Sequence, residues 1–233
     1  MGREIEKLVS ASEAHEIAAG VDKMAADSGY TDINDFNGEA DVIIDFSNHL
    51  GTAELLDYAV KRNIPAVIAT TGHTDDELKI IEKAAEKIAV FHSANMSLGV
   101  ALLVELAVKT AAVMPDADIE IVETHHNRKL DAPSGTALMI ANAIKKVREK
   151  AEFKLGRAGN AKREKNEIGI HAVRRGNIAG IHEVLVSTDT QTITLKHEAH
   201  SRALFAEGAI SAAEFLAGKP AGLYDKNSII RGE

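Results

Sequence analysis

The sequence predicts an α/β protein of two domains, one built on a parallel sheet with helices on both faces and one on an open mixed sheet. Through the first two-thirds of the chain, short apolar runs alternate with segments whose apolar residues recur at helical spacing. This alternation is the pattern of parallel βαβ units. Three strand-like runs then follow one another without helices between them, which is typical of antiparallel pairing. An apolar helical segment over residues 203–218 comes last, ending at Gly218 with Pro220 just beyond.

The composition is that of a globular protein and excludes several classes of function. The chain has 233 residues, 45% hydrophobic and 27% charged, enough to form one or two domains with their own cores. A net charge of −8 argues against nucleic acid as the main partner. The absence of cysteine excludes disulfides and thiolate zinc sites. No apolar run reaches the roughly 18 to 20 residues that span a bilayer. The opening MGREIEKL also lacks a signal-peptide pattern, so we predict a cytoplasmic protein that does not contact membranes.

The N-terminal part contains the alternating elements, starting with an amphipathic helix over residues 1–12. Short continuous apolar runs predict strands buried on both faces, and these runs are residues 16–21, 41–46, 65–72 and 88–95. Helical spacing predicts the helices that follow the last three strands, over residues 52–63, 74–87 and 98–114. Thr74 with acids directly after it is a typical helix start.

The remaining part begins with a predicted strand over residues 117–126, which leads into the segment ETHHNRKLDAPSGTA, residues 123–137. A helix is predicted next over residues 134–150, followed by a polar loop that contains glycine. The three consecutive strand-like runs are residues 167–175, 180–188 and 192–200. The sequence TDTQ at 188–191 is predicted to close a hairpin between the last two.

The opening helix and the acid that follows it fit part of a dinucleotide-binding fold. In such a fold a first strand leads through a glycine-rich turn into a helix whose N-terminus faces the pyrophosphate. Asp22 lies where the ribose-binding carboxylate is expected, about 20 residues on, and Lys23 beside it could meet a 2′-phosphate. Two interpretations remain open. Either the protein has no glycine loop and Asp22 is an ordinary acid at a strand end, or the sequence lacks about a dozen residues, one strand plus a turn. In the second case Met1 and the two residues after it are the tail of that turn.

The histidine-containing segment combines groups that titrate near neutrality with fixed positive charge. Histidine has an ordinary pKa near 6.5, so His125 or His126 can deliver a proton at cellular pH. Arg128 and Lys129 follow closely and favour an anionic substrate. A packed strand end is the alternative interpretation of the two histidines. The spacing of His125, His126 and Asp131 does not require a metal, and we predict none.

The same segment ends in the pattern of a helix start. Pro133 suits the beginning of a helix. The N–H groups of the first turn, around Gly135 and Thr136, can hold a carboxylate. Donors oriented in this way favour a diacid over a monoacid, because an unpaired buried donor is costly. The alternative is that Ser-Gly-Thr only caps the helix.

Six segments, in order along nearly the whole chain, resemble the 4-hydroxy-tetrahydrodipicolinate reductase (dihydrodipicolinate reductase) family. Residues 123–137 agree with E-x-H-H-x-x-K-x-D-x-P-S-G-T-A at every specified position. The other five segments are ATTGHTDDE, FHSANMSLGV, AVRRGNIAGIHEV, SRALFAEGA and GKPAGLYD. Six ordered matches make the resemblance specific.

The resemblance implies a fold and a reaction. It implies a Rossmann-type dinucleotide-binding domain of residues 1–96 and 203–233, with its first strand and glycine loop missing. It also implies an α+β substrate-binding and oligomerisation domain of residues 97–202, which forms a homotetramer through its sheet. The implied reaction is hydride transfer from NADH or NADPH to the dicarboxylate 4-hydroxy-tetrahydrodipicolinate. Loss of water accompanies it and gives tetrahydrodipicolinate, in lysine and diaminopimelate biosynthesis.

The family's motifs also imply roles for individual residues. His125 takes the position of the proton donor and Lys129 that of a second acid, so these two are the predicted catalytic residues. His126, Gly135 and Thr136 take positions that bind the carboxylates of the substrate. Other matched positions lie around the cofactor, and Met1 and Lys23 are added to them. The predicted cofactor-binding residues are Met1, Asp22, Lys23, Thr70, Thr71, Gly72, Ser93, Ala94, Asn95 and Met96.

Three departures from the family pattern define an alternative function. The glycine loop is missing, and Met96 stands where an aromatic residue is common. Ala69 replaces the glycine before Thr70, which is expected to place a methyl group where the backbone approaches the cofactor. The alternative is therefore a cofactor-deficient relative that folds and oligomerises without turnover. Asp22 and Lys23 are compatible with either NADH or NADPH.

Overall fold

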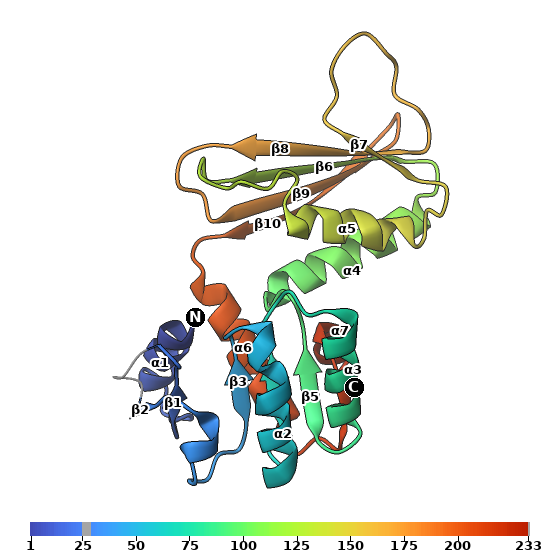
Figure 1. Cartoon of the computed structure of the whole chain (residues 1–233). Helices are drawn as coiled ribbons and strands as arrows, with labels where there is room; N and C mark the ends of the chain where they lie inside the picture. The colour runs from blue at the N-terminus through green and yellow to red at the C-terminus, as the bar shows by residue number, and fades with distance from the viewer. Residues whose placement is uncertain (25–28, 233) are drawn as a thin grey trace. The chain divides into compact units, whose positions relative to one another are not determined.

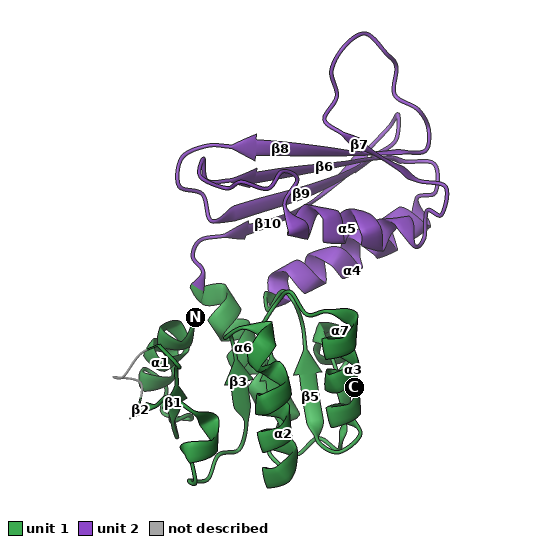
Figure 2. Cartoon of the chain, in the orientation of Figure 1, with its two compact units in different colours: residues 1–97, 203–233 green, residues 98–202 purple. Residues whose placement is uncertain are grey.

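The structure is a computed structural model that describes residues 1–24 and 29–232, and these residues form two compact units (Figure 1, Figure 2). Unit 1 combines Met1–Ser97 with Ala203–Glu233, and unit 2 is Leu98–Arg202. Unit 1 has a parallel sheet and unit 2 a mixed sheet, which confirms the predicted fold class. Within the described ranges, no helix is long and apolar enough to cross a membrane.

Unit 1 is built on a four-stranded parallel sheet of order β11-β5-β4-β3. The strands are β3 (Ile43–Asp45), β4 (Ala66–Ile68), β5 (Ala89–His92) and β11 (Gly222–Tyr224). The helices that cover its two faces are α2 (Thr52–Arg62), α3 (Asp75–Ala85) and α6 (Ala203–Leu216). Ile68 faces α2 and α3 while its neighbour Val67 faces α6, because successive strand residues point to opposite sides. Continuous apolar runs therefore predicted β3, β4 and β5 well.

The N-terminal elements of unit 1 lie outside this sheet. Helix α1 (Gly2–Ser10) packs Ile5 and Val9 against Ala206 of α6. The short strands β1 (Gly20–Val21) and β2 (Gly29–Tyr30) form a separate parallel ladder. The strand predicted over 16–21 is thus only two residues long. Within the described ranges, β3 pairs with β4 alone. The 3₁₀ turns of this unit are Ile33–Asp35 and His49–Gly51.

Local sequence determines where helix α3 begins. The Thr74 side chain caps the helix, and Glu77 accepts a hydrogen bond from the Thr74 backbone N–H at 2.7 Å, forming a capping box. Hydrogen bonds from the Thr74 N–H and then from His49 lower the pKa of Glu77 to about 2. The helix start predicted at Thr74 is confirmed. By contrast, β11 and helix α7 (Lys226–Arg231) were not predicted, because β11 is short and its partner β5 is distant in the sequence.

Unit 2 is a five-stranded sheet of order β10-β9-β6-β8-β7, with helices on one face. Its elements are α4 (Leu98–Val113), β6 (Asp118–His125), α5 (Gly135–Lys145), β7 (Glu152–Leu155), β8 (Glu167–Arg174), β9 (Gly180–Ser187) and β10 (Thr192–Ala199). The predicted hairpin is confirmed: β9 and β10 are antiparallel, and the Thr188 N–H donates to the Gln191 carbonyl at 2.8 Å. Strand β7 lies in the segment that was predicted to be loop.

The expectation of simple antiparallel neighbours was wrong for β8 and β9. Strand β6 lies between them, parallel to β8 and antiparallel to β9. The connection from β8 to β9, residues 175–179, therefore passes the end of β6 and bonds to it. The His126 N–H donates to the Ile178 carbonyl at 2.9 Å, and the Arg175 N–H donates to the His125 carbonyl at 2.9 Å. These bonds fix the backbone of the paired histidines.

Replacing Gly208 by alanine is expected to destabilise unit 1. A Cβ at this position of α6 would lie 1.8 Å from the Met96 carbonyl oxygen and 2.8 Å from its carbon. Both are backbone atoms, so the helix itself must shift, and we expect a loss of about 2 kcal/mol or more in the free energy of unfolding. Denaturant unfolding measures this loss. Gly2→Ala is the matched control, because a Cβ at Gly2 meets nothing within 4 Å. Equal stability of the two variants would contradict the close approach.

Candidate active site

Strand β6 runs from the apolar core of unit 2 to an end that carries polar side chains. Ile119, Ile121, Glu123 and His125 occupy alternate positions, so they share one face of the strand. The two isoleucines pack in the core beneath α4 and α5. Glu123 is completely buried and His125 is 8% exposed. The same alternation that fills the core thus places a carboxylate and an imidazole side by side at its edge.

The Glu123 carboxylate is held by four hydrogen bonds. One oxygen accepts from His125 Nδ1 at 2.6 Å and Arg174 Nη1 at 2.8 Å, and the other from Arg174 Nη2 at 2.7 Å and the Ser134 N–H at 2.9 Å. Burial acts to raise the pKa of Glu123, but these bonds from Arg174, His125 and Ser134 outweigh it and hold the pKa below its ordinary value. Glu123 is therefore a charged carboxylate whose acceptor capacity is filled.

Two strand registers bring the partners of Glu123 and His125 together. In the pairing of β6 with β9, Glu123 lies opposite His182. In the pairing of β6 with β8, His125 lies opposite Arg174. The His125 and His182 rings meet edge to face, with centroids 5.2 Å apart, and His182 Nε2 lies 3.1 Å from Ser134 Oγ. Burial first, and then the charge of His125, lower the pKa of His182 to about 4. His182 is consequently neutral near pH 7.

Helix α5 begins where the sequence predicted a helix start, and this start is bonded to Glu123. Ser134 is the N-cap, and its hydroxyl accepts a hydrogen bond from the Ala137 N–H at 3.2 Å. The Ser134 backbone is bonded to Glu123, so the first turn of the helix, with Gly135 and Thr136, is fixed close to the His125 ring. Gly135 is exposed, and a Cβ there would meet nothing within 4 Å. The positive end of the α5 dipole therefore lies on the side of Glu123 and His125.

His126 and Lys129 lie in the turn that follows β6. The Lys129 N–H donates to the His126 carbonyl at 3.2 Å, and Lys129 Nζ is paired with Asp131 at 2.8 Å. Burial first, and then nearby positive charges that include Arg128 and Lys129, lower the pKa of His126. Its Nδ1 atom is buried and has no hydrogen-bond partner among the described residues. Both predicted residues are thus in the segment that also holds His125 and the helix start.

The predicted cofactor residues that follow β4 and β5 lie at one edge of the unit 1 sheet. Thr70, Thr71 and Gly72 follow β4, and Ser93, Ala94 and Asn95 follow β5. The two strands are parallel neighbours, so their carboxyl ends meet at the same edge. Asp45, at the end of β3, accepts a hydrogen bond from the Thr70 hydroxyl at 2.8 Å and is itself buried. Gly72 has a φ of +89°, a conformation that favours glycine.

Two of the side chains near these turns point into the core. Met96 is 2% exposed and packs against α6. Ala69 is 5% exposed and belongs to the same cluster. The Ala69 methyl group thus packs against core residues, whereas Thr71 is exposed. The expectation about the approach of a cofactor at Ala69 stays a prediction.

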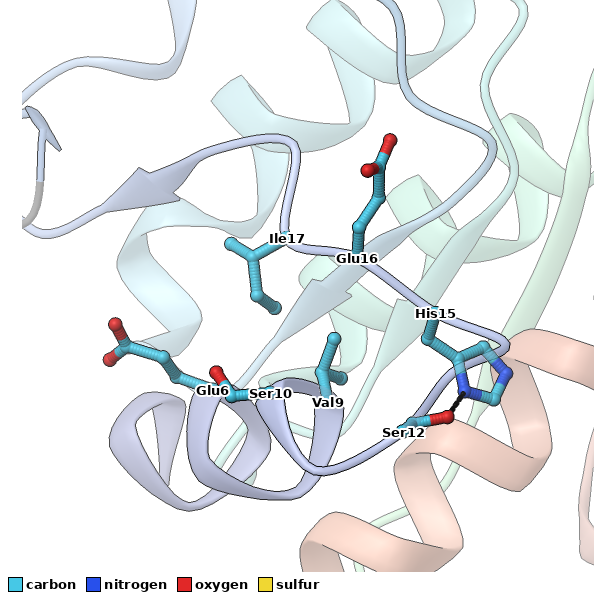
Figure 3. A pocket seen from close by; sticks show the side chains of 7 residues that line it. All are labelled: Glu6, Val9, Ser10, Ser12, His15, Glu16 and Ile17. Atoms are coloured by element: carbon cyan, nitrogen blue, oxygen red, sulfur yellow. Dashed lines mark hydrogen bonds between the residues drawn. The ribbon is translucent and has the colours of Figure 1, made fainter.

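The remaining predicted residues of unit 1 belong to its N-terminal part. Met1 precedes α1, and its carbonyl accepts a hydrogen bond from the Glu4 N–H at 2.9 Å. Asp22 directly follows β1 and is exposed, as is Lys23, whose Nζ is paired with Glu54 at 3.0 Å. A hollow in this part lies between α1 and the segment that follows it (Figure 3). It is lined by Glu6, Val9, Ser10, Ser12, His15, Glu16 and Ile17, none of which was a predicted site residue.

Sequence reasoning missed several polar residues of the histidine site. Glu123 was part of the quoted motif, but no role was inferred for it, although its alternation with His125 could have suggested one. Ser134 was part of the predicted helix start, and Arg174 and His182 lie in the quoted segment AVRRGNIAGIHEV, but no contact with Glu123 was inferred for them. Strand registers and the start of α5 bring these residues to Glu123. Among residues 1–24 and 29–232, no group of three or more histidine or acidic side chains could hold a metal ion.

Comparison with known proteins gives a consistent result over the whole chain. Residues 1–96 match the family model described as dihydrodipicolinate reductase, N-terminus, and residues 99–230 match the one for its C-terminus. The 4-hydroxy-tetrahydrodipicolinate reductase of Caldanaerobacter subterraneus subsp. tengcongensis is 48% identical over 236 residues, covering 99% of this chain and 94% of that protein. The reductase of the same name from Clostridium novyi is 43% identical over 239 residues, covering 100% and 95%.

Solved structures agree. Dipicolinate-bound dihydrodipicolinate reductase from Paenisporosarcina sp. TG-14 is 26% identical, with a TM-score of 0.76, covering 97% of this chain and 94% of that chain. The diaminopimelate (DAP) dehydrogenase of C. glutamicum, 13% identical with a TM-score of 0.57 and covering 96% and 89%, shares the fold alone. From the site geometry, the family models and these relatives, the chain belongs to the dihydrodipicolinate reductase family.

Proposed function

We propose that this protein reduces 4-hydroxy-tetrahydrodipicolinate to tetrahydrodipicolinate, with NADH or NADPH as the hydride donor and with loss of water. The relatives named 4-hydroxy-tetrahydrodipicolinate reductase, which align over almost their full length, support this assignment. The single observation that carries it is the buried carboxylate and imidazole pair, Glu123 and His125, held against the first turn of α5.

Unit 1 carries the cofactor in this proposal, and its residues fit a pyridine nucleotide. The turns after β4 and β5 lie at the carboxyl edge of a parallel sheet, which is where such folds bind ligands. Gly72, with its positive φ, lets the backbone of the first turn approach a ligand closely. Asp22 and Lys23 are the exposed residues proposed to contact the ribose or a 2′-phosphate. The bound nicotinamide supplies the hydride.

Unit 2 binds the substrate and supplies the proton. Hydride addition leaves electron density conjugated with the ring nitrogen of the substrate, so the product forms only when a proton is added. His125 gives this proton from Nε2, and Lys129 is the second acid. His126 and the N–H groups of Gly135 and Thr136 bind the substrate carboxylates, assisted by the positive end of α5. The buried, unpartnered Nδ1 of His126 is consistent with a polar partner arriving with the substrate.

We also propose a cytoplasmic homotetramer that forms through the sheet of unit 2. Helices α4 and α5 pack on only one face of this sheet. The other face carries Val122 and Val173, which are partly exposed and point to the same side as Glu120. An open apolar and charged face of this kind is suited to pairing with a second copy. No finding favours the alternative of a relative that cannot use cofactor.

Titration of the protein with NADH and with NADPH tests the assignment. We expect saturable binding of at least one of them at micromolar to millimolar concentration, followed by turnover when 4-hydroxy-tetrahydrodipicolinate is added. Fluorescence of the reduced nicotinamide measures binding, and its loss of absorbance measures turnover. Comparing the two affinities shows whether the protein prefers NADH or NADPH, which Asp22 and Lys23 do not determine. Undetectable binding of both at millimolar concentration would exclude the proposed reaction for this chain.

A further inference from the structure

We propose that Glu123 is the positioning residue of the proton donor: it holds the hydrogen of the His125 ring on Nδ1 and so directs Nε2 toward the substrate. This inference rests on the proposed function for its catalytic consequence. Its structural part, the tautomer of His125, is independent of that function and can be measured without substrate.

The hydrogen bonds of Glu123 determine which nitrogen of His125 carries the hydrogen. A carboxylate only accepts hydrogen bonds, and Glu123 accepts one from His125 Nδ1 at 2.6 Å. Its other partners, the Arg174 guanidinium and the Ser134 N–H, are obligate donors at 2.7 to 2.9 Å. They keep the carboxylate charged and fixed in place. A neutral His125 beside it must therefore carry its hydrogen on Nδ1 and leave Nε2 bare. Nε2 takes up a proton from solvent, and the resulting imidazolium gives that proton to the substrate and returns to the Nδ1–H form.

The other side of the ring is kept open by a glycine. Nε2 has no hydrogen-bond partner within the described residues, and a Cβ at Gly180 would lie 3.1 Å from it. Gly180 is buried at the start of β9 and its φ is not among the positive ones, so backbone conformation does not require glycine there. The space that it leaves lies directly at the atom that is proposed to give up the proton.

The neighbours of the ring do not compete for this proton. The titratable and charged groups that face His125 are Glu123 on its own strand, Arg174 on β8 and His182 on β9, with Lys129 in the turn after β6. His182 is 4% exposed and neutral, and Arg174 is bonded to Glu123 and to the Asp131 carbonyl. His125 is thus the one member of this group that combines an anchored Nδ1 with an unoccupied Nε2.

Replacing Glu123 by glutamine gives a specific structural prediction. The glutamine amide must turn its NH₂ toward one of the two former oxygen sites. One site faces two obligate donors, Arg174 and Ser134, and the other faces Arg174 and the His125 ring. Only the ring can change from donor to acceptor. The NH₂ group therefore faces His125, whose hydrogen moves to Nε2. Neutral His125 then has no bare Nε2 to take up the proton that the imidazolium gives to the substrate.

Nuclear magnetic resonance of ¹⁵N-labelled histidine rings tests this, with His125→Gln used to assign the His125 signals. We expect the Nδ1–H form in the wild type and the Nε2–H form in Glu123→Gln, with kcat reduced roughly 10- to 100-fold. Glu120→Gln is the matched control. Glu120 also lies on β6 and bonds to a histidine, His171, at 2.7 Å, but on the opposite face of the sheet. It should change neither the His125 tautomer nor kcat.

Gly180→Ala provides a second variant that leaves the Glu123 carboxylate in place. We expect it to keep the Nδ1–H form and to lower kcat roughly tenfold, because its methyl group crowds Nε2 of a ring that Glu123 holds fixed. Finding the Nε2–H form of His125 in the wild type would by itself overturn the proposal. Normal kcat in Glu123→Gln would overturn it as well. A tautomer change in a protein that never turns over would support the role of Glu123 in the ring geometry and contradict the proposed function instead.

Discussion

His125→Gln is expected to lower kcat by roughly 10²-fold or more, the usual effect of removing a general acid. Glutamine is polar and of similar size, and its amide can still bond to Glu123, so the buried site stays filled. It cannot release a proton near neutral pH, whereas an imidazolium can. Because the proton is needed only as the hydride arrives, the loss should appear in kcat more than in KM. Steady-state kinetics with saturating cofactor measures both.

His171→Gln is the control for this substitution. His171 lies on β8 of the same unit and is bonded to Glu120 on the sheet face opposite Glu123. The same chemical change there should leave kcat near that of the wild type. A near-normal rate for His125→Gln itself would remove this residue from the role of proton donor.

Lys129→Ala is expected to raise KM about tenfold or more and to lower kcat as well. The substrate is a dianion, and removing one charged hydrogen bond to it typically costs about 1.5 to 3 kcal/mol. In the structure Lys129 Nζ is paired with Asp131; the Lys129 side chain is 22% exposed and that of Asp131 is 58% exposed. A pair whose carboxylate is open to solvent in this way contributes about 1 kcal/mol or less. Lys129 can therefore exchange Asp131 for a substrate carboxylate at little cost.

Lys165→Ala separates this effect from a general loss of positive charge. Lys165 lies in the same unit and is paired with Asp116 at 2.8 Å, with both side chains 80% exposed. Its removal changes the net charge equally but is expected to leave KM unchanged. If Lys129→Ala also leaves KM unchanged, the proposed contact of Lys129 with the substrate is wrong, and any effect on kcat has to come from its role as an acid.

The parts of the fold that were predicted correctly depend on local sequence. The Thr74 and Glu77 capping box forms between residues three apart, so its pattern is sufficient to place the start of α3. Strand β4 is apolar at every position, and β5 at every position before His92, because both faces of their sheet are covered. By contrast, β7 and β11 are four and three residues long and are strands only because a distant neighbour pairs with them.

The sequence by itself determined the α/β class, the helix start at Ser134 and the grouping of His125, His126 and Lys129, because each depends on residues that are close in the chain. Only the tertiary structure decided the insertion of β6 between β8 and β9, and with it the partners of the imidazole. Arg174 and His182 reach Glu123 through the registers of these strands. Register depends on how whole strands pack over the core, so the groups that surround the Glu123 carboxylate come in part from residues that no local pattern connects to it.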